Sequence, residues 1–384
     1  MTTDELVKNT LTAVADQAVV PPGLAQRAWR QRTRRRITTA TTAAVAVIAA
    51  VTAGTIIAPS MAGRDDRQVA IGVLTPAGPF PTLAADPGRP TPQSRVGAGN
   101  VTLAAYASCR QGGTGCSWSM LDPGTGRYRT TPWGWIAVSP AGHTAAVLEG
   151  PLPARRIGLV DTGTGAVRRW IDLDRADGGG LAWSPDGRRL LVTTYNGDPG
   201  LVEDTGGQAS RTGFYIVDAE SGTATFRRLP GDPAFRGMRA DLSWSRDGSL
   251  IWEETGSPQL PRAYYTLNGD ARPGPDPEST SDQPAGASPD GRLVASGGKM
   301  GSAPFVVEAS SGETTLLEPS GGLVIGRLLA WTDDTHLIAW ATDGGSADER
   351  RFRLVLVDVE KPRDVTPLTG WTDRLARPDW VPVF

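Results

Sequence analysis

Short apolar runs alternate with polar turns over most of the chain, and one such pattern returns several times. In "LAWSPDGRRLLVTT", residues 181–194, an apolar run ending in Trp leads into Ser-Pro-Asp-Gly and then into a second apolar run. Related stretches begin at 242 ("LSWSRDGSLIWEE"), 285 ("AGASPDGRLVASG") and 329 ("LAWTDDTHLIAWA"). Pro presets φ, Asp bonds the nearby backbone and Gly accepts positive φ, so each copy predicts a tight hairpin between two buried strands.

A second turn signal recurs with a similar period. It appears as "LVDTGTG" at 159, "IVDAESG" at 216, "VVEASSG" at 306 and "LVDVEKP" at 356, each after an apolar run and before another short one. Two hairpins give four strands per unit. The first-turn residues Ser139, Ser184, Ser245, Ser288 and Thr332 are 45, 61, 43 and 44 positions apart. A period near 45 with four strands is typical of a β-propeller blade.

The two ends of this region predict how the ring closes. Residues 99–132 supply three strands without a preceding first hairpin, and the chain ends in "RPDWVPVF", where Trp380 aligns with Trp183. We therefore predict an all-β fold with six blades over 99–384, in which the last strand completes the first blade. Such closure leaves no long sheet edge exposed. The repeated Trp residues are expected to pack as wedges between blades (Trp183, Trp244, Trp331 and Trp380).

The "LAWSPDGRRLLV" and "IVDAESG" patterns resemble the WD40-like, PD40-type repeats of the TolB-like propeller family. The resemblance covers residues 99–384, about three quarters of the chain. It implies the propeller fold and is not specific for any activity.

The segment before the propeller predicts a membrane anchor. Residues 37–58 carry no charge, and as a helix they would span about 33 Å against a hydrocarbon core of about 30 Å. Arg34, Arg35 and Arg36 directly precede them, which predicts a cytoplasmic N-terminus and an extracytoplasmic propeller. A cleaved signal peptide is the alternative, because "TRRRI" loosely resembles a twin-arginine signal and Ser60-Met61-Ala62 resembles a cleavage site. The protein would then be secreted.

The predicted organisation has a cytoplasmic helical arm at 1–36, a transmembrane helix at 37–58, a Pro/Gly-rich linker at 59–98 and the propeller at 99–384. Thr2 and Glu5 fit a helix capping box at the start of the arm. The arm is similar to the short cytoplasmic segments of actinobacterial anti-sigma-like membrane proteins, which implies a cytoplasmic protein partner. The alternative is a helix lying on the membrane surface.

Charge and cysteine content narrow the environment. A net charge of −2 argues against nucleic acid as the main partner. The chain's two cysteines, Cys109 and Cys116, flank "RQGGTG" at the facing ends of two expected antiparallel strands. Outside the cytoplasm they are predicted to form a disulfide.

Residues with catalytic chemistry are sparse. His143 and His336 both lie just after a hairpin turn, and no nucleophile elbow or phosphate-binding loop is present. Asp186, Asp247 and Asp290 lack the alternating acidic ligands of a calcium loop, so we interpret them as turn residues. We expect no enzyme activity, cofactor or metal. A calcium-dependent propeller lactonase is the least favoured alternative.

Loop lengths point to a recognition surface. The two tight turns of each blade fall on one face, whereas the longer segments at 195–212, 231–241, 255–263 and 343–352 are expected on the other. Variable loops on a rigid scaffold commonly carry binding. Candidate binding residues are the charged ones on two of these loops (Asp198, Glu203, Asp204, Asp348, Glu349, Arg350 and Arg351). The sequence thus predicts a membrane-anchored module that binds an unidentified protein or envelope ligand; a signal-transducing, anti-sigma-like sensor is the alternative.

Overall fold

The computed structural model describes residues 82–109, 116–175, 177–199, 209–231, 239–257, 260–297, 303–346, 349–372 and 380–384. The arm, the three arginines Arg34, Arg35 and Arg36, the apolar segment 37–58 and the first part of the linker lie outside these ranges. No helix within the ranges has the length and apolar character needed to cross a membrane.

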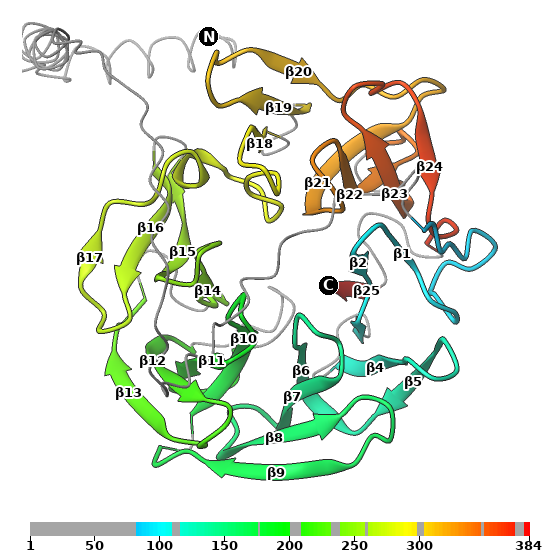
Figure 1. The fold of residues 1–384 in the computed structure, drawn as a ribbon. Helices are drawn as coiled ribbons and strands as arrows, with labels where there is room; N and C mark the ends of the chain where they lie inside the picture. The colour runs from blue at the N-terminus through cyan, green and yellow to red at the C-terminus, as the bar shows by residue number, and fades with distance from the viewer. Residues whose placement is uncertain are drawn as a thin grey trace, which may run out of the picture. The chain divides into compact units, whose positions relative to one another are not determined.

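In the described part of the chain, six antiparallel sheets follow one another around a ring (Figure 1). We number these blades in chain order and give the strands of each from the centre outward. Blade 1 contains β25 (Trp380–Val383), β3 (Ala105–Cys109), β4 (Cys116–Asp122) and β5 (Arg127–Thr131). Blade 2 contains β6 (Trp133–Val138), β7 (Thr144–Glu149), β8 (Arg156–Asp161) and β9 (Val167–Asp172). Blade 3 contains β10 (Gly178–Trp183), β11 (Arg189–Tyr195), β12 (Arg211–Asp218) and β13 (Ala224–Arg228).

The second half of the ring has the same design with one exception. Blade 4 contains β14 (Ser243–Trp244), β15 (Leu250–Ser257), β16 (Leu260–Thr266) and β17 (Ala271–Arg272). Blade 5 contains β18 (Leu293–Gly297), β19 (Pro304–Glu308) and β20 (Thr314–Leu316). Blade 6 contains β21 (Val324–Trp331), β22 (His336–Thr342), β23 (Phe352–Asp358) and β24 (Val365–Pro367). The protein is a six-bladed β-propeller.

The C-terminal strand closes the ring as the sequence predicts. β25 pairs antiparallel with β3, with Val381 opposite Ala107. The Trp380 side chain is buried; its Nε1 donates a hydrogen bond to the Pro90 carbonyl at 2.9 Å, and its ring centroid lies 4.9 Å from that of Trp340. Blade 1 is thereby tied to blade 6.

A short hairpin precedes the first blade and was not expected from the sequence. It consists of β1 (Gly97–Ala98) and β2 (Val101–Thr102). Val96 and Ala98 are buried in the same apolar cluster as Trp340 and Trp380. The end of the Pro/Gly-rich segment therefore packs on the propeller.

The Ser-Pro-Asp-Gly turns are hydrogen-bonded within themselves. Ser184 is fully buried, and its Oγ donates to Asp186 Oδ1 at 2.5 Å and accepts from the Arg189 N–H at 2.9 Å. Gly187 closes the turn with φ of +68°, a conformation that favours glycine. Equivalent bonds join Ser245 to Asp247. The structural interpretation of these aspartates is confirmed.

The repeated tryptophans link neighbouring blades. Trp183 Nε1 donates to the Ala137 carbonyl of blade 2 at 3.0 Å, and Trp244 Nε1 donates to the Ala182 carbonyl of blade 3 at 3.1 Å. Trp331 of blade 6 reaches the Gly286 carbonyl at 3.1 Å. The rings of Trp244 and Trp331 are buried and that of Trp183 is partly buried, and each indole N–H has an acceptor in the neighbouring blade, as expected from the sequence.

Blade 5 departs from the four-strand prediction. The stretch "AGASPDG" at 285 was expected to supply its inner strand, but among the described residues it forms only an isolated bridge between Ala287 and Val294. Gly286 has φ of +62°, which is outside the extended region and interrupts strand pairing at this position. The inner position of blade 5 is therefore irregular.

Candidate functional site

The two faces of the propeller differ in their connections. Because the strands of each blade are antiparallel, the first and third connections fall on one face, called here the turn face. The second connection of each blade and the link to the next blade fall on the other, called here the loop face. The connection between β11 and β12 covers residues 196–210, and the one between β22 and β23 covers residues 343–351. These two long loops lie on the loop face, as predicted.

One expected long loop is absent. β15 continues to Ser257 and β16 begins at Leu260, so residues 255–263 belong mainly to a hairpin with a short connection. This segment was expected to be one of the longer connections, but a register shift between Glu254 and Ser257 lets the strands continue to the hairpin end. The prediction of a loop here is wrong.

The candidate binding residues divide into two groups. Glu203, Asp204 and Asp348 lie outside the described residues. Asp198 lies on the β11–β12 connection of blade 3, whereas Glu349, Arg350 and Arg351 lie on the β22–β23 connection of blade 6. The structure therefore places the two charged loops on different, non-adjacent blades.

The charges of the blade 6 loop are bound within that loop. Arg351 Nε lies 2.9 Å from Asp343 Oδ2, and this side-chain hydrogen bond holds the pKa of Asp343 below its usual range. Arg350 Nε donates to the Gly345 carbonyl at 2.9 Å, and Ser346 Oγ donates to Glu349 Oε2 at 2.9 Å. Their contacts fix the shape of the loop; a role in binding stays a prediction.

A hollow of about 330 Å³ opens on the loop-face end of blade 3. Its lining comes from the link between blades 2 and 3, from both ends of the β11–β12 connection and from the end of β13 (Arg175, Asn196, Ser210, Arg211, Thr212, Phe226, Arg228 and Pro230). We call it the blade-3 hollow. Among the described lining residues three are arginines, and none is acidic.

Arg211 is occupied by structural contacts. Its side chain is buried, and Nη1 lies 2.6 Å from Glu253 Oε2 of blade 4. Its Nε and Nη1 also donate to the Leu229 and Ala240 carbonyls at 3.0 and 3.2 Å. This guanidinium joins blades 3 and 4, and its charge is balanced by Glu253.

The Arg175 guanidinium uses only some of its donors in contacts within the fold, and the Arg228 guanidinium uses none with the described residues. The Arg175 guanidinium lies 4.5 Å from the Phe226 ring centroid, and its Nε lies 3.4 Å from Asp177 Oδ2. Burial raises the pKa of Asp177 despite this contact. Arg228 is exposed at the end of β13, and its guanidinium has no hydrogen bond or ion pair with any described residue. The described part of the lining thus carries a net positive charge.

Phe226 provides the apolar side of the hollow. Its ring packs against Tyr215 at 5.2 Å between centroids. Gly213 makes room for the ring, because a Cβ at this position would lie 2.9 Å from Phe226 Cζ. No motif in the sequence marks this site, since its residues come from four separate segments.

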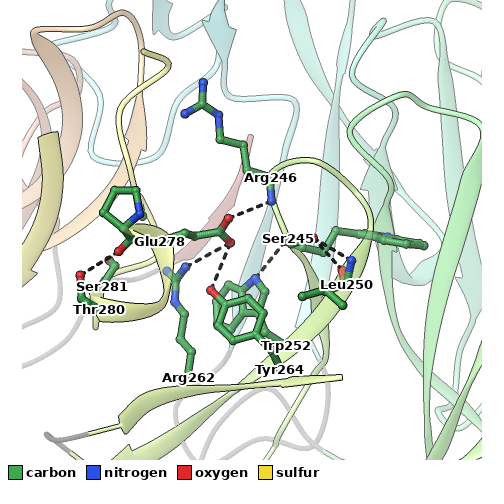
Figure 2. A network of polar contacts seen from close by, with 12 residues as sticks. Ser245, Arg246, Leu250, Trp252, Arg262, Tyr264, Glu278, Thr280 and Ser281 are labelled. Atoms are coloured by element: carbon green, nitrogen blue, oxygen red, sulfur yellow. Dashed lines mark hydrogen bonds and ion pairs between the residues drawn. The ribbon is translucent and has the colours of Figure 1, made fainter. Parts of the chain in front are cut away.

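A second arginine cluster, between blades 4 and 5, has a different character (Figure 2). Arg262 lies 3.6 Å from Glu278, in the short 3-10 helix η3 (Glu278–Thr280), and stacks 3.9 Å from the Trp252 ring centroid. Glu278 also accepts hydrogen bonds from Tyr264 Oη at 3.3 Å and from the Arg246 N–H at 3.1 Å. Burial raises the pKa of Tyr264 to about 12.

This network replaces apolar packing beside the irregular inner edge of blade 5. Arg262 also donates to the Gln283 carbonyl at 2.5 Å, and Ser281 Oγ donates to the Ala295 carbonyl of β18 at 2.7 Å. The Glu278 carboxylate and the Arg262 guanidinium in Figure 2 are thus bonded to neighbouring side chains and to the backbone. We interpret the cluster as structural.

The cysteines and His336 also make contacts that stabilise the fold. Cys109 and Cys116 form the disulfide that the sequence predicts, with 4.2 Å between their Cα atoms. His336 Nδ1 lies 3.0 Å from Asp333 Oδ1 within a turn, and His143 is exposed. No group of three or more His, Cys, Asp or Glu residues in the described ranges could hold a metal ion.

Comparison with known proteins gives fold neighbours only. No family model and no curated protein matches the chain. Among solved structures, it is similar to TolB from Acinetobacter baumannii, with 15% identity, a TM-score of 0.41 and coverage of 72% of this chain and 65% of that one. The chain thus spans slightly less than two thirds of TolB.

Two enzymes are among the other similar structures. An oligogalacturonate lyase in complex with manganese matches at 14% identity and a TM-score of 0.43, covering 70% of this chain and 74% of that one. The Pyrococcus horikoshii acylaminoacyl peptidase matches at 13% identity and a TM-score of 0.42, covering 75% of this chain and 46% of that one. The propeller assignment rests on the strand order of this chain's own sheets.

Proposed function

We propose that this chain is a membrane-anchored, extracytoplasmic propeller that binds a ligand or protein partner on its loop face. The observation that carries the proposal is the contrast between the faces. Turn-face polar groups such as Ser184 and Asp186 bond each other, whereas the loop face has a hollow lined by Arg228, whose guanidinium has no partner among the described residues. Binding surfaces need polar groups that the fold itself does not use.

Two further features support the location. The Cys109–Cys116 disulfide is typical of oxidising compartments outside the cytoplasm. The uncharged stretch 37–58 behind an arginine cluster is typical of a single membrane span with the chain after it outside.

Location is tested with reporter fusions and terminal sequencing. Alkaline phosphatase fused after Phe384 should be active in cells, and a fluorescent protein that folds only in the cytoplasm should be dark at the same position. Sequencing of the mature protein should find residues before 37 retained. A start at residue 63 or later would show a cleaved signal, and a cytoplasmic reporter signal would contradict the proposed topology.

Partner binding is tested by capture from envelope extract with the full chain. The β11–β12 connection can be shortened between Gly197 and Ala209, because a Cβ on Gly197 would lie only 3.7 Å from Ala209 Cβ. Residues 198–208 can therefore be replaced by an Asn-Gly turn while β11 and β12 keep their pairing. We expect this variant to lose the captured partner, and a turn-face control, Ser310→Arg, to keep it. Equal capture by both variants would contradict the choice of face.

The proposal assigns no catalytic activity to the propeller. The purified chain should therefore not hydrolyse lactones, with or without added calcium. Turnover that depends on the chain and on a divalent cation would contradict this assignment.

Signal transduction is a second candidate, supported by the arm at residues 1–36. Its capping box and its position before the apolar segment favour a cytoplasmic docking helix. The full chain should then capture a cytoplasmic protein that a chain lacking residues 2–30 does not. Capture of the same proteins by both would remove this candidate and leave the loop-face proposal intact.

A further inference from the structure

We propose that the blade-3 hollow binds a small organic anion, with a carboxylate or phosphate held between Arg175 and Arg228 and an apolar portion against Phe226. This inference deepens the proposed function and rests on it, because it names the ligand chemistry of one loop-face site.

The charge argument depends on which guanidinium groups the fold already uses. Glu253 and backbone carbonyls fully engage Arg211. Arg175 retains capacity beyond its 3.4 Å contact with Asp177, and Arg228 has no partner among the described residues. A guanidinium presents five N–H donors in a planar fork that fits carboxylate and phosphate oxygens in a bidentate manner. An anion would supply the acceptors that the lining lacks.

The apolar argument comes from the same walls. Phe226 is partly buried and faces the Arg175 guanidinium at 4.5 Å, and Pro230 completes this side of the lining. An aromatic or aliphatic group of the ligand would remove this surface from water. The volume of about 330 Å³ is at the lower end of the range for small-molecule sites, which fits a compact ligand rather than a peptide.

One further donor lies in the lining. Asn196 Oδ1 accepts a hydrogen bond from the Ser210 N–H at 2.7 Å. This contact orients the side-chain amide, and its NH₂ group, which has no acceptor among the described residues, is placed to donate to a ligand. The bond also ties the two ends of the β11–β12 connection together, so the donor is positioned by the fold.

The test is calorimetric titration of the full chain in detergent, with detergent alone as a blank. The probes are phenyl phosphate, benzoate, inorganic phosphate and the uncharged benzyl alcohol. We expect phenyl phosphate or benzoate to bind with about millimolar affinity, and the tighter of the two to identify the preferred head group. Inorganic phosphate should bind more weakly because it lacks the contact with Phe226. Benzyl alcohol should show no saturable binding.

The decisive variant is Arg228→Glu, which changes an exposed side chain with no partner in the described structure. It should lower the affinity for phenyl phosphate and benzoate by roughly tenfold or more. The matched control is Arg272→Glu, an equal charge change on the outer strand of blade 4, where Arg272 is also exposed. It should leave the affinity unchanged.

The inference is overturned if neither phenyl phosphate nor benzoate shows saturable binding, or if benzyl alcohol binds as tightly as they do. It is also overturned if Arg228→Glu binds these anions as tightly as the parent chain, or if Arg272→Glu loses as much affinity as Arg228→Glu. Partner capture from extract separates this failure from failure of the proposed function. If capture still depends on residues 198–208 while anions do not bind, only the inference is lost.

Discussion

The junction between blades 2 and 3 and the junction between blades 4 and 5 use opposite kinds of side chain. The first buries an apolar cluster in which Leu148, Ile157 and Leu190 are fully inaccessible to solvent. The second buries Arg262 and Glu278 at its centre. In the described residues, five apolar clusters join neighbouring blades, and none of them joins blades 4 and 5.

The difference shows what each kind of junction requires. Apolar packing is not directional and tolerates changes of similar volume, whereas a buried ion pair must keep every partner to offset its desolvation. The comparison also distinguishes the two arginine sites. At the blade 4–5 junction the Arg262 guanidinium is bonded within the fold, but that of Arg228 at the edge of blade 3 has no partner among the described residues. An arginine is therefore a candidate for ligand binding when its guanidinium lacks partners among the described residues, and its positive charge alone is not sufficient.

The largest effect is expected for Glu278→Ala. This change leaves the buried Arg262 guanidinium without its carboxylate and should lower the free energy of unfolding by about 3–5 kcal/mol. Chemical denaturation of the full chain measures it. The control is Glu254→Ala, which breaks an exposed pair with Arg327 and should cost less than about 1 kcal/mol. Similar losses for both variants would show that the network is not structural.

The polar junction should also lose stability in alkali. The pKa of Tyr264 is raised to about 12 in the folded chain by burial, so between pH 10 and 12 the unfolded chain releases a proton that the folded chain retains. Stability is therefore lost as the pH rises through this window, by up to about 2 kcal/mol after allowance for screening. A Tyr264→Phe variant should show a smaller loss. In an ultraviolet titration, the difference between the parent chain and Tyr264→Phe should correspond to one phenol that ionises near pH 12. A difference centred near pH 10 would contradict the raised pKa.

The apolar junction should respond in proportion to the volume removed. Ile157→Val deletes one buried methylene from the blade 2–3 cluster and should cost about 0.5–1.5 kcal/mol. Glu278→Gln, which keeps the volume but removes the charge, should cost more. The opposite order in denaturation experiments would reverse the comparison between the two junctions.

The smallest effect concerns Asp177, beside the blade-3 hollow. Burial raises its pKa, so its ionised form costs stability above the ordinary pKa of an aspartate, and this cost disappears at lower pH. Asp177→Asn should therefore raise stability slightly at pH 7, by less than about 1 kcal/mol, and have no benefit near pH 3. A benefit that persists at pH 3 would assign the effect to something other than charge.

The features that could be predicted from sequence are those set by local chemistry. The turn at Ser184 follows from four adjacent residues, and the pairing of β25 with β3 follows from a repeat that is interrupted at both ends. The Trp wedges recur with the same period, so their positions between blades could also be anticipated.

The features that could not be predicted depend on distant residues or on a single conformation. The positive φ of Gly286 removes the expected inner strand of blade 5, and the sequence pattern there still looks like the other repeats. The blade-3 hollow combines Arg175, Asn196 and Arg228 from separate segments. Charge content pointed to acidic residues of the β11–β12 connection, whose ends line the hollow, and to the β22–β23 loop, where Arg351 proves to be paired with Asp343.

The ring is closed by β25, which completes blade 1 beside blade 6. Cross-linking tests this directly, because Val381 and Ala107 are opposite each other in the register of β25 and β3. In a chain with Ala107→Cys and Val381→Cys, mild oxidation should join the two positions nearly completely, as seen in the mass of the linked peptides. The offset pair Ala107→Cys and Val383→Cys should not be joined. Failure of the first pair, or equal joining of both, would contradict the closed six-bladed ring.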